Sequence, residues 1–157
     1  MAHGSRAFLP HLIASGDGHV VNISSIFGMV SVPKNAAYNA SKFATRGFTE
    51  ALRQEMQMDK LPVGVSCVHP GGIRTNIAIS GRRGPSEAGR DVAASFERVA
   101  RTTPEQAAKV ILKGIQLNKG RIFIGRDAHM IDLVQRLLGI GYEKIVGPNY
   151  IKRVNGK

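Results

Sequence analysis

The fold is decided by residues 18–42, which read Gly18-His19-Val20-Val21-Asn22-Ile23-Ser24-Ser25 and, after a loop, Tyr38-Asn39-Ala40-Ser41-Lys42. The first part is rich in β-branched residues and predicts a short buried strand over residues 19–24. The second part lies near the start of the longest helical pattern in the chain, residues 36–58, where small apolar residues recur at helical spacing. A strand followed by a long helix is typical of a parallel sheet.

The same kinds of pattern recur on both sides of this stretch. Apolar runs predict further strands over residues 63–68 and 121–124, and Pro70-Gly71-Gly72 closes the first of them. The run Thr103-Pro104-Glu105-Gln106 has the residue types of a helix start and predicts a helix over 104–117. Two more helices are predicted over 2–14, with a kink or break at Pro10, and over 127–138.

This order of elements predicts an α/β fold: a doubly wound parallel sheet of about three strands in an α/β/α three-layer arrangement. Residues 1–157 are assigned to part of one such domain, with a loop at 76–102 and a basic C-terminal tail at 140–157. In parallel sheets the chemistry lies beyond the carboxyl ends of the strands. The segments that follow Ser24, Val68 and Ile124 are therefore the candidate functional segments.

Composition excludes several classes of protein. The chain has 43% hydrophobic and 21% charged residues, which is typical of a globular domain rather than a disordered tail. The one cysteine, Cys67, allows no internal disulfide and favours a reducing, cytoplasmic setting; it is read as a small core residue. No apolar run is long enough to span a membrane, and the dispersed histidines predict no metal site.

The net charge of +11 raises nucleic acid as a partner. The aromatic content is only 6%, and no aromatic residues are interleaved with the basic ones. No known nucleic-acid-binding motif accompanies them. We therefore expect no nucleic acid partner, and read the charge as a solvated surface and as a preference for an anionic cofactor or substrate.

The spacing of Tyr38 and Lys42 indicates a chemical role. Residues four apart lie on one face of a helix, so the two side chains are neighbours. A nearby ammonium favours the ionised form of a phenol, and a serine hydroxyl at the strand end would share a substrate oxygen with it. This layout suits proton transfer to a carbonyl while a hydride arrives from elsewhere. The alternative without catalysis is that Tyr38 is a packing residue and that the Lys42 side chain lies in solvent.

Three segments together resemble the short-chain dehydrogenase/reductase family: residues 18–28, Tyr38-Asn39-Ala40-Ser41-Lys42, and Val68-His69-Pro70-Gly71-Gly72-Ile73-Arg74-Thr75. The resemblance implies a catalytic acid/base at Tyr38, a residue at Lys42 that assists it and binds the nicotinamide ribose, and a substrate-orienting serine at Ser25. It also implies NAD or NADP as cofactor, with Tyr38 and Lys42 joined in binding it by Pro70, Gly71, Ile73 and Thr75.

The resemblance further implies an alcohol or carbonyl substrate. Ser25, Ile26, Phe27 and Val32 are the residues expected to contact it, with residues 76–102 as a substrate loop or lid. Apolar residues around Val32 favour a lipophilic compound. The helices at 2–14 and 36–58 resemble those that form dimer or tetramer bundles in this family, so a homo-oligomer is expected.

The chain departs from the family pattern in one large respect. Family members open with a strand, a Gly-rich turn and a helix that cradle the pyrophosphate. Gly16-Asp17-Gly18 precedes a strand, not a helix, and is read as a turn. The chain is therefore interpreted as the C-terminal portion of a dehydrogenase with a truncated Rossmann-like sheet, which leaves NAD versus NADP undecided. We expect an unpaired edge at strand 19–24, and marginal stability, weak activity and weak cofactor binding for this portion alone.

Two alternatives remain open at this stage. The chain could be a non-catalytic interaction fragment, because Ala40, Ala44, Gly47 and Ala51 would admit a partner helix; the other reading is that they pack on the sheet. The tail at 140–157 is read as packing on a subunit or as a lid, with contact to a membrane surface as the alternative.

Overall fold

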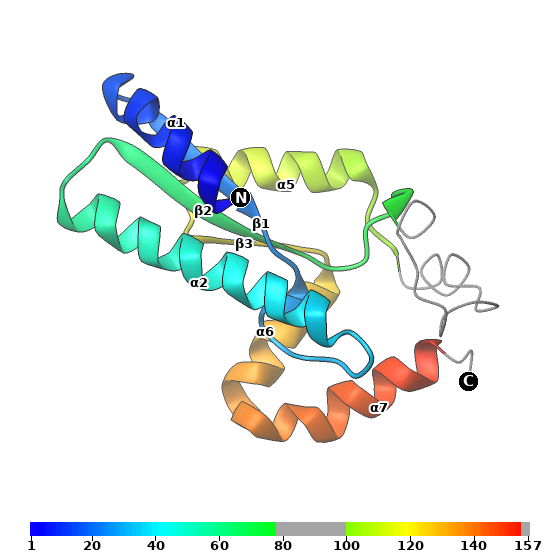
Figure 1. The fold of residues 1–157 in the computed structure, drawn as a ribbon. Coiled ribbons are helices and arrows are strands. Elements are labelled where there is room, and N and C mark those ends of the chain that lie inside the picture. Colours follow the sequence, from blue (N-terminus) through cyan, green and yellow to red (C-terminus); the bar gives the residue numbers. More distant parts are fainter. Residues whose placement is uncertain (78–99, 155–157) are drawn as a thin grey trace.

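The computed structural model describes residues 1–77 and 100–154, and every strand and helix predicted in these ranges is present (Figure 1). In chain order the elements are α1 (Ala2–Ala14), β1 (Gly18–Ile23), η1 (Ile26–Gly28), α2 (Ala36–Met58), β2 (Val63–Pro70), α5 (Pro104–Gln116), β3 (Arg121–Ile124), α6 (Arg126–Leu138), η3 (Gly139–Tyr142) and α7 (Glu143–Val154). The break expected at Pro10 does not occur, since α1 continues through it. Residues 78–99, most of the expected substrate loop, lie outside the described residues.

The three strands form one parallel sheet in the order β1-β2-β3. The register of β1 with β2 pairs Gly18 with Val63 and Ile23 with Val68. Strand β2 pairs in turn with β3, where Cys67 lies beside Arg121. Within the described residues β1 pairs with β2 alone, so its outer edge is open, as expected from the sequence. The predicted parallel α/β sheet is therefore confirmed.

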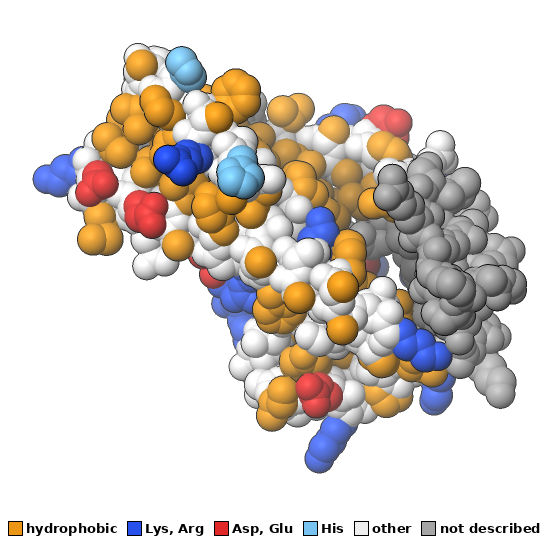
Figure 2. Space-filling view, viewed as in Figure 1, with side chains coloured by type: hydrophobic (Ala, Val, Ile, Leu, Met, Phe, Trp, Pro, Cys, Tyr) orange, Lys and Arg blue, Asp and Glu red, His pale blue; other side chains and the backbone are white. Residues whose placement is uncertain are grey.

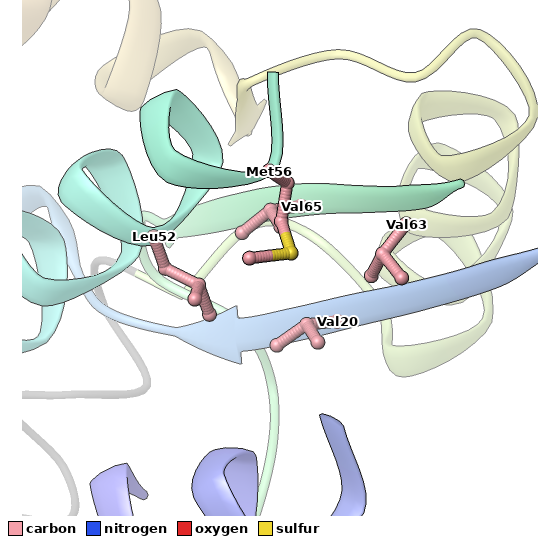
Figure 3. Packing of buried hydrophobic residues seen from close by; sticks show 5 residues of the cluster. All are labelled: Val20, Leu52, Met56, Val63 and Val65. Carbon is pink, nitrogen blue, oxygen red and sulfur yellow. The ribbon is translucent and has the colours of Figure 1, made fainter. Parts of the chain in front are cut away.

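Helices cover both faces of the sheet. One core cluster consists of Val20, Leu52, Met56, Val63 and Val65, with partly buried residues of α1 and α2 packed against it (Figure 3). A second cluster unites β2 and β3 with α5 and consists of Val68, Ala107, Ile122 and Ile124. Because successive side chains of a strand point to opposite faces, Val65 and Val68 belong to different layers. Cys67 is fully buried, as predicted, and burial raises the pKa of its thiol to about 11.

The start of α5 follows the sequence signal closely. The Thr103 side chain accepts a hydrogen bond from the Gln106 backbone N–H at 3.2 Å, and the Gln106 side chain accepts one from the Thr103 N–H at 3.0 Å. Pro104 occupies the first turn, where its missing N–H costs nothing. This reciprocal cap sets the point at which the chain enters α5 after the loop.

The C-terminal tail is helical, which the sequence analysis did not predict. It forms η3 and α7 and packs against the loop between η1 and α2. The Ser31 N–H donates to the Tyr142 hydroxyl at 3.0 Å, and the Asn35 side-chain amide donates to the Tyr150 hydroxyl at 2.7 Å. In the described structure the tail therefore packs on its own chain.

The small-residue stripe of α2 faces away from the sheet. Ala40, Ala44, Gly47 and Ala51 are all exposed, so the reading in which they pack on the sheet is wrong. Helix α1 likewise has no buried residue, and Phe8 is 66% exposed. Figure 2 shows hydrophobic side chains gathered on the visible face, while lysines and arginines lie apart from one another. Among the described residues, no helix is both long and apolar enough to cross a bilayer.

Candidate functional site

The carboxyl ends of the strands bring the predicted site segments to one edge of the sheet. The Ser24 N–H donates to the Val68 carbonyl at 2.8 Å and continues the pairing of β1 with β2. The Gly71 N–H donates to the Ile124 carbonyl at 2.9 Å and continues the pairing of β2 with β3. The segment after each strand is thereby held beside the next, as expected for a parallel sheet.

The two serines at the end of β1 have different environments. The Ser24 hydroxyl donates to the Lys42 carbonyl at 2.8 Å, and the residue is 2% exposed. The Ser25 hydroxyl accepts from the Phe27 N–H at 3.1 Å, and within the described residues its own proton has no acceptor. Ser24 therefore fastens β1 to α2, whereas Ser25 retains a proton that it can donate to a substrate.

Helix α2 places Tyr38 and Lys42 beside this edge. The Lys42 ammonium donates to the Ile23 carbonyl at 3.2 Å and lies 5.5 Å from the centre of the Tyr38 ring. Tyr38 is 41% exposed, and no described residue hydrogen-bonds its hydroxyl. The expectation that the two side chains share one helix face is confirmed.

Close packing of η1 on α2 depends on Gly28. A side chain there would collide with the Ser24 hydroxyl and with the Lys42 carbonyl, so only glycine lets the two segments approach this closely. The Phe27 ring also contacts the Tyr38 ring edge-on, with 6.4 Å between the ring centres. These contacts tie the Ser25 turn to the helix that carries Tyr38 and Lys42.

The segment after β2 is held by its backbone. The Thr102 N–H donates to the Gly72 carbonyl at 3.3 Å, and the Arg74 N–H donates to the Thr102 carbonyl at 2.9 Å. In this parallel bridge the hydrogen bonds flank Ile73 and leave its own N–H and C=O without a partner among the described residues. Pro70 and Gly71 are half-buried and Thr75 is exposed. A free donor and a free acceptor on one residue suit recognition of an amide.

Asp127 is a site residue that the sequence analysis missed. One of its carboxylate oxygens accepts from the Gly72 N–H at 2.9 Å. A side chain at Gly71 would collide with the same carboxylate, and so would one at Gly125, which has φ of +94°. The signal available in the sequence is an acidic residue in the first turn of a helix just after a strand.

His69 is the second residue whose position the sequence analysis did not interpret. It is fully buried, and its Nδ1 lies 3.0 Å from the Ser25 carbonyl oxygen. Among the described residues no group of His, Cys, Asp or Glu side chains is placed to hold a metal ion.

The expected substrate residues divide into two groups. Ser25, Ile26 and Phe27 belong to the turn beside Tyr38. Val32 is 3% exposed and borders a hollow that Asn39 and Phe43 also line. Helical geometry puts those two residues on a different side of α2 from Tyr38 and Lys42. The structure thus brings the first group to the catalytic candidates and leaves Val32 apart from them.

Comparison with known proteins identifies a consistent set of relatives. The model of the short chain dehydrogenase family matches residues 1–85, which is more than half of the chain. SadH of Mycobacterium tuberculosis, provisionally named an oxidoreductase, is 48% identical over 153 residues, which cover 97% of this chain. The chain spans about half of that protein, 55% of its length. Dehydrogenase/reductase SDR family member 7B of Xenopus laevis is 38% identical over 111 residues, or 71% of this chain and 33% of that protein.

Solved structures show the same fold. A Burkholderia phymatum short chain dehydrogenase/reductase in complex with NAD has a TM-score of 0.72 at 24% identity, over 93% of this chain and 55% of the other. A Burkholderia cenocepacia short chain dehydrogenase in complex with NADP has a TM-score of 0.69 at 23% identity, over 88% of this chain and 52% of the other. A Streptomyces avermitilis short-chain dehydrogenase is 30% identical, with a TM-score of 0.64, over 90% of this chain and 56% of the other.

Proposed function

The chain belongs to the short-chain dehydrogenase family, and we propose that it carries the catalytic centre of an NAD- or NADP-dependent oxidoreductase that interconverts an alcohol and a ketone or aldehyde. The observation that supports this most is that two hydroxyls with unused hydrogen-bonding capacity lie on segments that meet at one sheet edge. The Tyr38 hydroxyl has no partner, and the Ser25 hydroxyl keeps a free proton, among the described residues. Such groups can bind one substrate oxygen together.

In this proposal the roles follow from chemistry. The ionised Tyr38 oxygen takes the proton from the substrate alcohol, and in the reverse direction the Tyr38 hydroxyl gives its proton to the carbonyl oxygen. The Lys42 ammonium lies 5.5 Å from the centre of the Tyr38 ring and is assigned the role of assisting the acid/base group. The Ser25 hydroxyl donates a hydrogen bond to the substrate oxygen and orients it. Ser24 holds α2 against the strand end and does not touch the substrate.

The residues after β2 fit the nicotinamide end of a dinucleotide. The N–H and C=O of Ile73, which no described residue hydrogen-bonds, match an amide group, and the Thr75 hydroxyl and the Lys42 ammonium supply further polar contacts. When bound, NAD or NADP supplies or accepts the hydride. NAD is the ligand of one structural relative and NADP of another, which supports a nicotinamide cofactor without choosing between them.

The substrate class follows from the turn next to Tyr38. Ile26 and Phe27 supply an apolar wall, and the Tyr150 ring of α7 lies edge-on to Phe27 with 5.6 Å between the centres. An apolar wall beside two hydroxyls suits a lipophilic alcohol or carbonyl compound. We also propose a homo-oligomer, because the exposed small residues of α2 admit a second helix.

The test is a Tyr38→Phe substitution in the full-length protein that contains this chain. Loss of the acid/base hydroxyl is expected to lower kcat by at least about a hundredfold. Tyr142→Phe is the matched control, because it removes the same atom from a tyrosine that bonds the Ser31 backbone in the tail packing. Its turnover is expected to stay near that of the parent. Unchanged turnover of Tyr38→Phe would refute the assigned role.

A further inference from the structure

His69 lies between the Ser25 turn on one side and the aromatic rings of Phe123 and His129 on the other. Its side chain is fully buried, and its ring packs on Phe123 with 5.5 Å between the centres. Phe123 in turn contacts the His129 ring of α6 at 5.4 Å. The histidine is thus held from one side by packing, while its Nδ1 atom meets the Ser25 carbonyl oxygen at 3.0 Å.

The protonation state of this ring follows from its two nitrogen atoms. A carbonyl oxygen only accepts hydrogen bonds, so the Nδ1 atom beside it must carry the proton. The Nε2 atom is buried, and no described residue hydrogen-bonds it. A proton on Nε2 would therefore be a buried donor without an acceptor, which is costly. Burial also lowers the pKa of His69, which favours the neutral ring.

We propose that His69 is a positioning residue that sets the orientation of the Ser25 hydroxyl by holding the Ser25 carbonyl through its Nδ1–H. This inference rests on the proposed function, in which Ser25 binds the substrate oxygen. His69 itself touches neither substrate nor cofactor in this role.

The hydrogen bonds around Ser25 explain how the effect is transmitted. Its carbonyl accepts from the Gly28 N–H at 3.0 Å as well as from His69, and its hydroxyl accepts from the Phe27 N–H. The backbone bonds come from the same short turn, so they move together with it. Of the hydrogen bonds that Ser25 itself makes to described residues, the one from His69 comes from a neighbouring strand. Without it the Ser25 peptide loses its anchor on β2, and the hydroxyl can shift from its working position.

The first experiment reads the tautomer and does not depend on activity. The full-length protein is labelled with ¹⁵N-histidine, and the His69 signals are identified by their loss in His69→Asn. We expect a neutral ring protonated at Nδ1 at neutral pH. A ring protonated at Nε2 alone would overturn the proposal, because Nδ1 would then have no proton to donate to the Ser25 carbonyl.

The second experiment compares three substitutions in kinetics. In His69→Asn the side-chain amide nitrogen can occupy the Nδ1 position and donate to the same carbonyl, so kcat is expected near the parental value. His69→Leu has no donor and is expected to lower kcat about five- to tenfold, with the KM for cofactor unchanged. His69→Gln carries its amide one bond further out and is expected to resemble the leucine variant. It replaces that variant in the comparison if leucine prevents folding. Equal kcat values for Asn and for the donor-free or displaced variants would overturn the proposal.

The two levels of hypothesis fail in distinguishable ways. If the full-length protein oxidises no alcohol and reduces no carbonyl compound, the proposed function fails, while the tautomer is still measurable. If Tyr38→Phe abolishes turnover and His69→Leu retains it in full, the function stands and the positioning role of His69 is refuted.

Discussion

At the scale of single residues, neighbouring serines with the same chemistry have separate tasks. Ser24 donates its hydroxyl proton to the Lys42 carbonyl, whereas the Ser25 hydroxyl is an acceptor with its proton free. Ser25→Ala is therefore expected to lower kcat at least about tenfold, and the loss of the bond from the Phe27 N–H is expected to cost about 1 kcal/mol of stability. Ser24→Ala removes the part-buried hydrogen bond to the Lys42 carbonyl and is expected to lower the free energy of unfolding by about 1 kcal/mol.

Steady-state kinetics and thermal unfolding of both variants separate the two tasks. Ser25→Thr, which keeps a hydroxyl, is the control for the first variant. A Ser24→Ala protein with full stability and strongly reduced kcat would show that the hydroxyl of Ser24, not that of Ser25, meets the substrate.

At the scale of elements, α6 supports the segment after β2 through one carboxylate. Asp127 lies in the first turn of α6 and accepts from the Gly72 N–H next to Ile73. Asp127→Ala removes that acceptor and is expected to raise the KM for the nicotinamide cofactor about tenfold, because the Ile73 N–H and C=O lose their fixed direction. Asp127→Asn keeps an acceptor oxygen and is expected to stay within about threefold of the parent. Cofactor titrations of the two variants check this, and equal affinities would contradict it.

The sequence predicts most of the helices and strands whose position depends on a local pattern of apolar residues. Period-two and period-3.6 runs locate β1, α2, β2, α5 and β3, because burial on one or two faces shapes those stretches. The tail escaped prediction because Gly139, Gly141, Gly147 and Pro148 interrupt its helical pattern, and packing on Ser31 and Asn35 stabilises it instead.

The catalytic candidates could be predicted from the sequence, whereas Asp127 and His69, the residues that position their surroundings, could not. Tyr38, Lys42 and Ser25 belong to short motifs with fixed spacing. Asp127 acts on Gly72, which is 55 residues away in the chain, so the contact exists only once β3 pairs with β2. His69 reads as one more residue of an apolar strand until the register places it against the Ser25 turn.

At the scale of the whole molecule, the outer edge of β1 is open among the described residues, and the candidate site lies beyond the carboxyl ends of the strands. Within the described residues the outer side of β1 has no partner strand, and Ile23 at its end is 49% exposed. An unpaired parallel edge of this kind is a template for pairing with another strand. The expectation that these 157 residues are marginally stable and bind cofactor weakly on their own stays a prediction, and the open edge is its physical basis.

The last prediction concerns the outer face of α2, which the sheet does not use. Ala44 is exposed in the middle of the small-residue stripe, so a glutamate there would place a charge and extra volume where a second helix must approach. Ala44→Glu in the full-length protein is expected to shift the oligomer toward monomer in analytical ultracentrifugation, with the helix itself preserved, since alanine and glutamate both favour helices.

Gln57→Glu is the matched control for Ala44→Glu, because it adds the same charge to an exposed position of α2 outside the stripe. The control is expected to sediment like the parent. An Ala44→Glu protein with unchanged sedimentation would place any oligomer contact elsewhere on the molecule, whereas equal dissociation of both variants would assign the effect to net charge. Pairing through α2 is supported if Ala44→Glu dissociates and Gln57→Glu does not. The two variants add the same charge, but only Ala44→Glu changes the shape of the small-residue face.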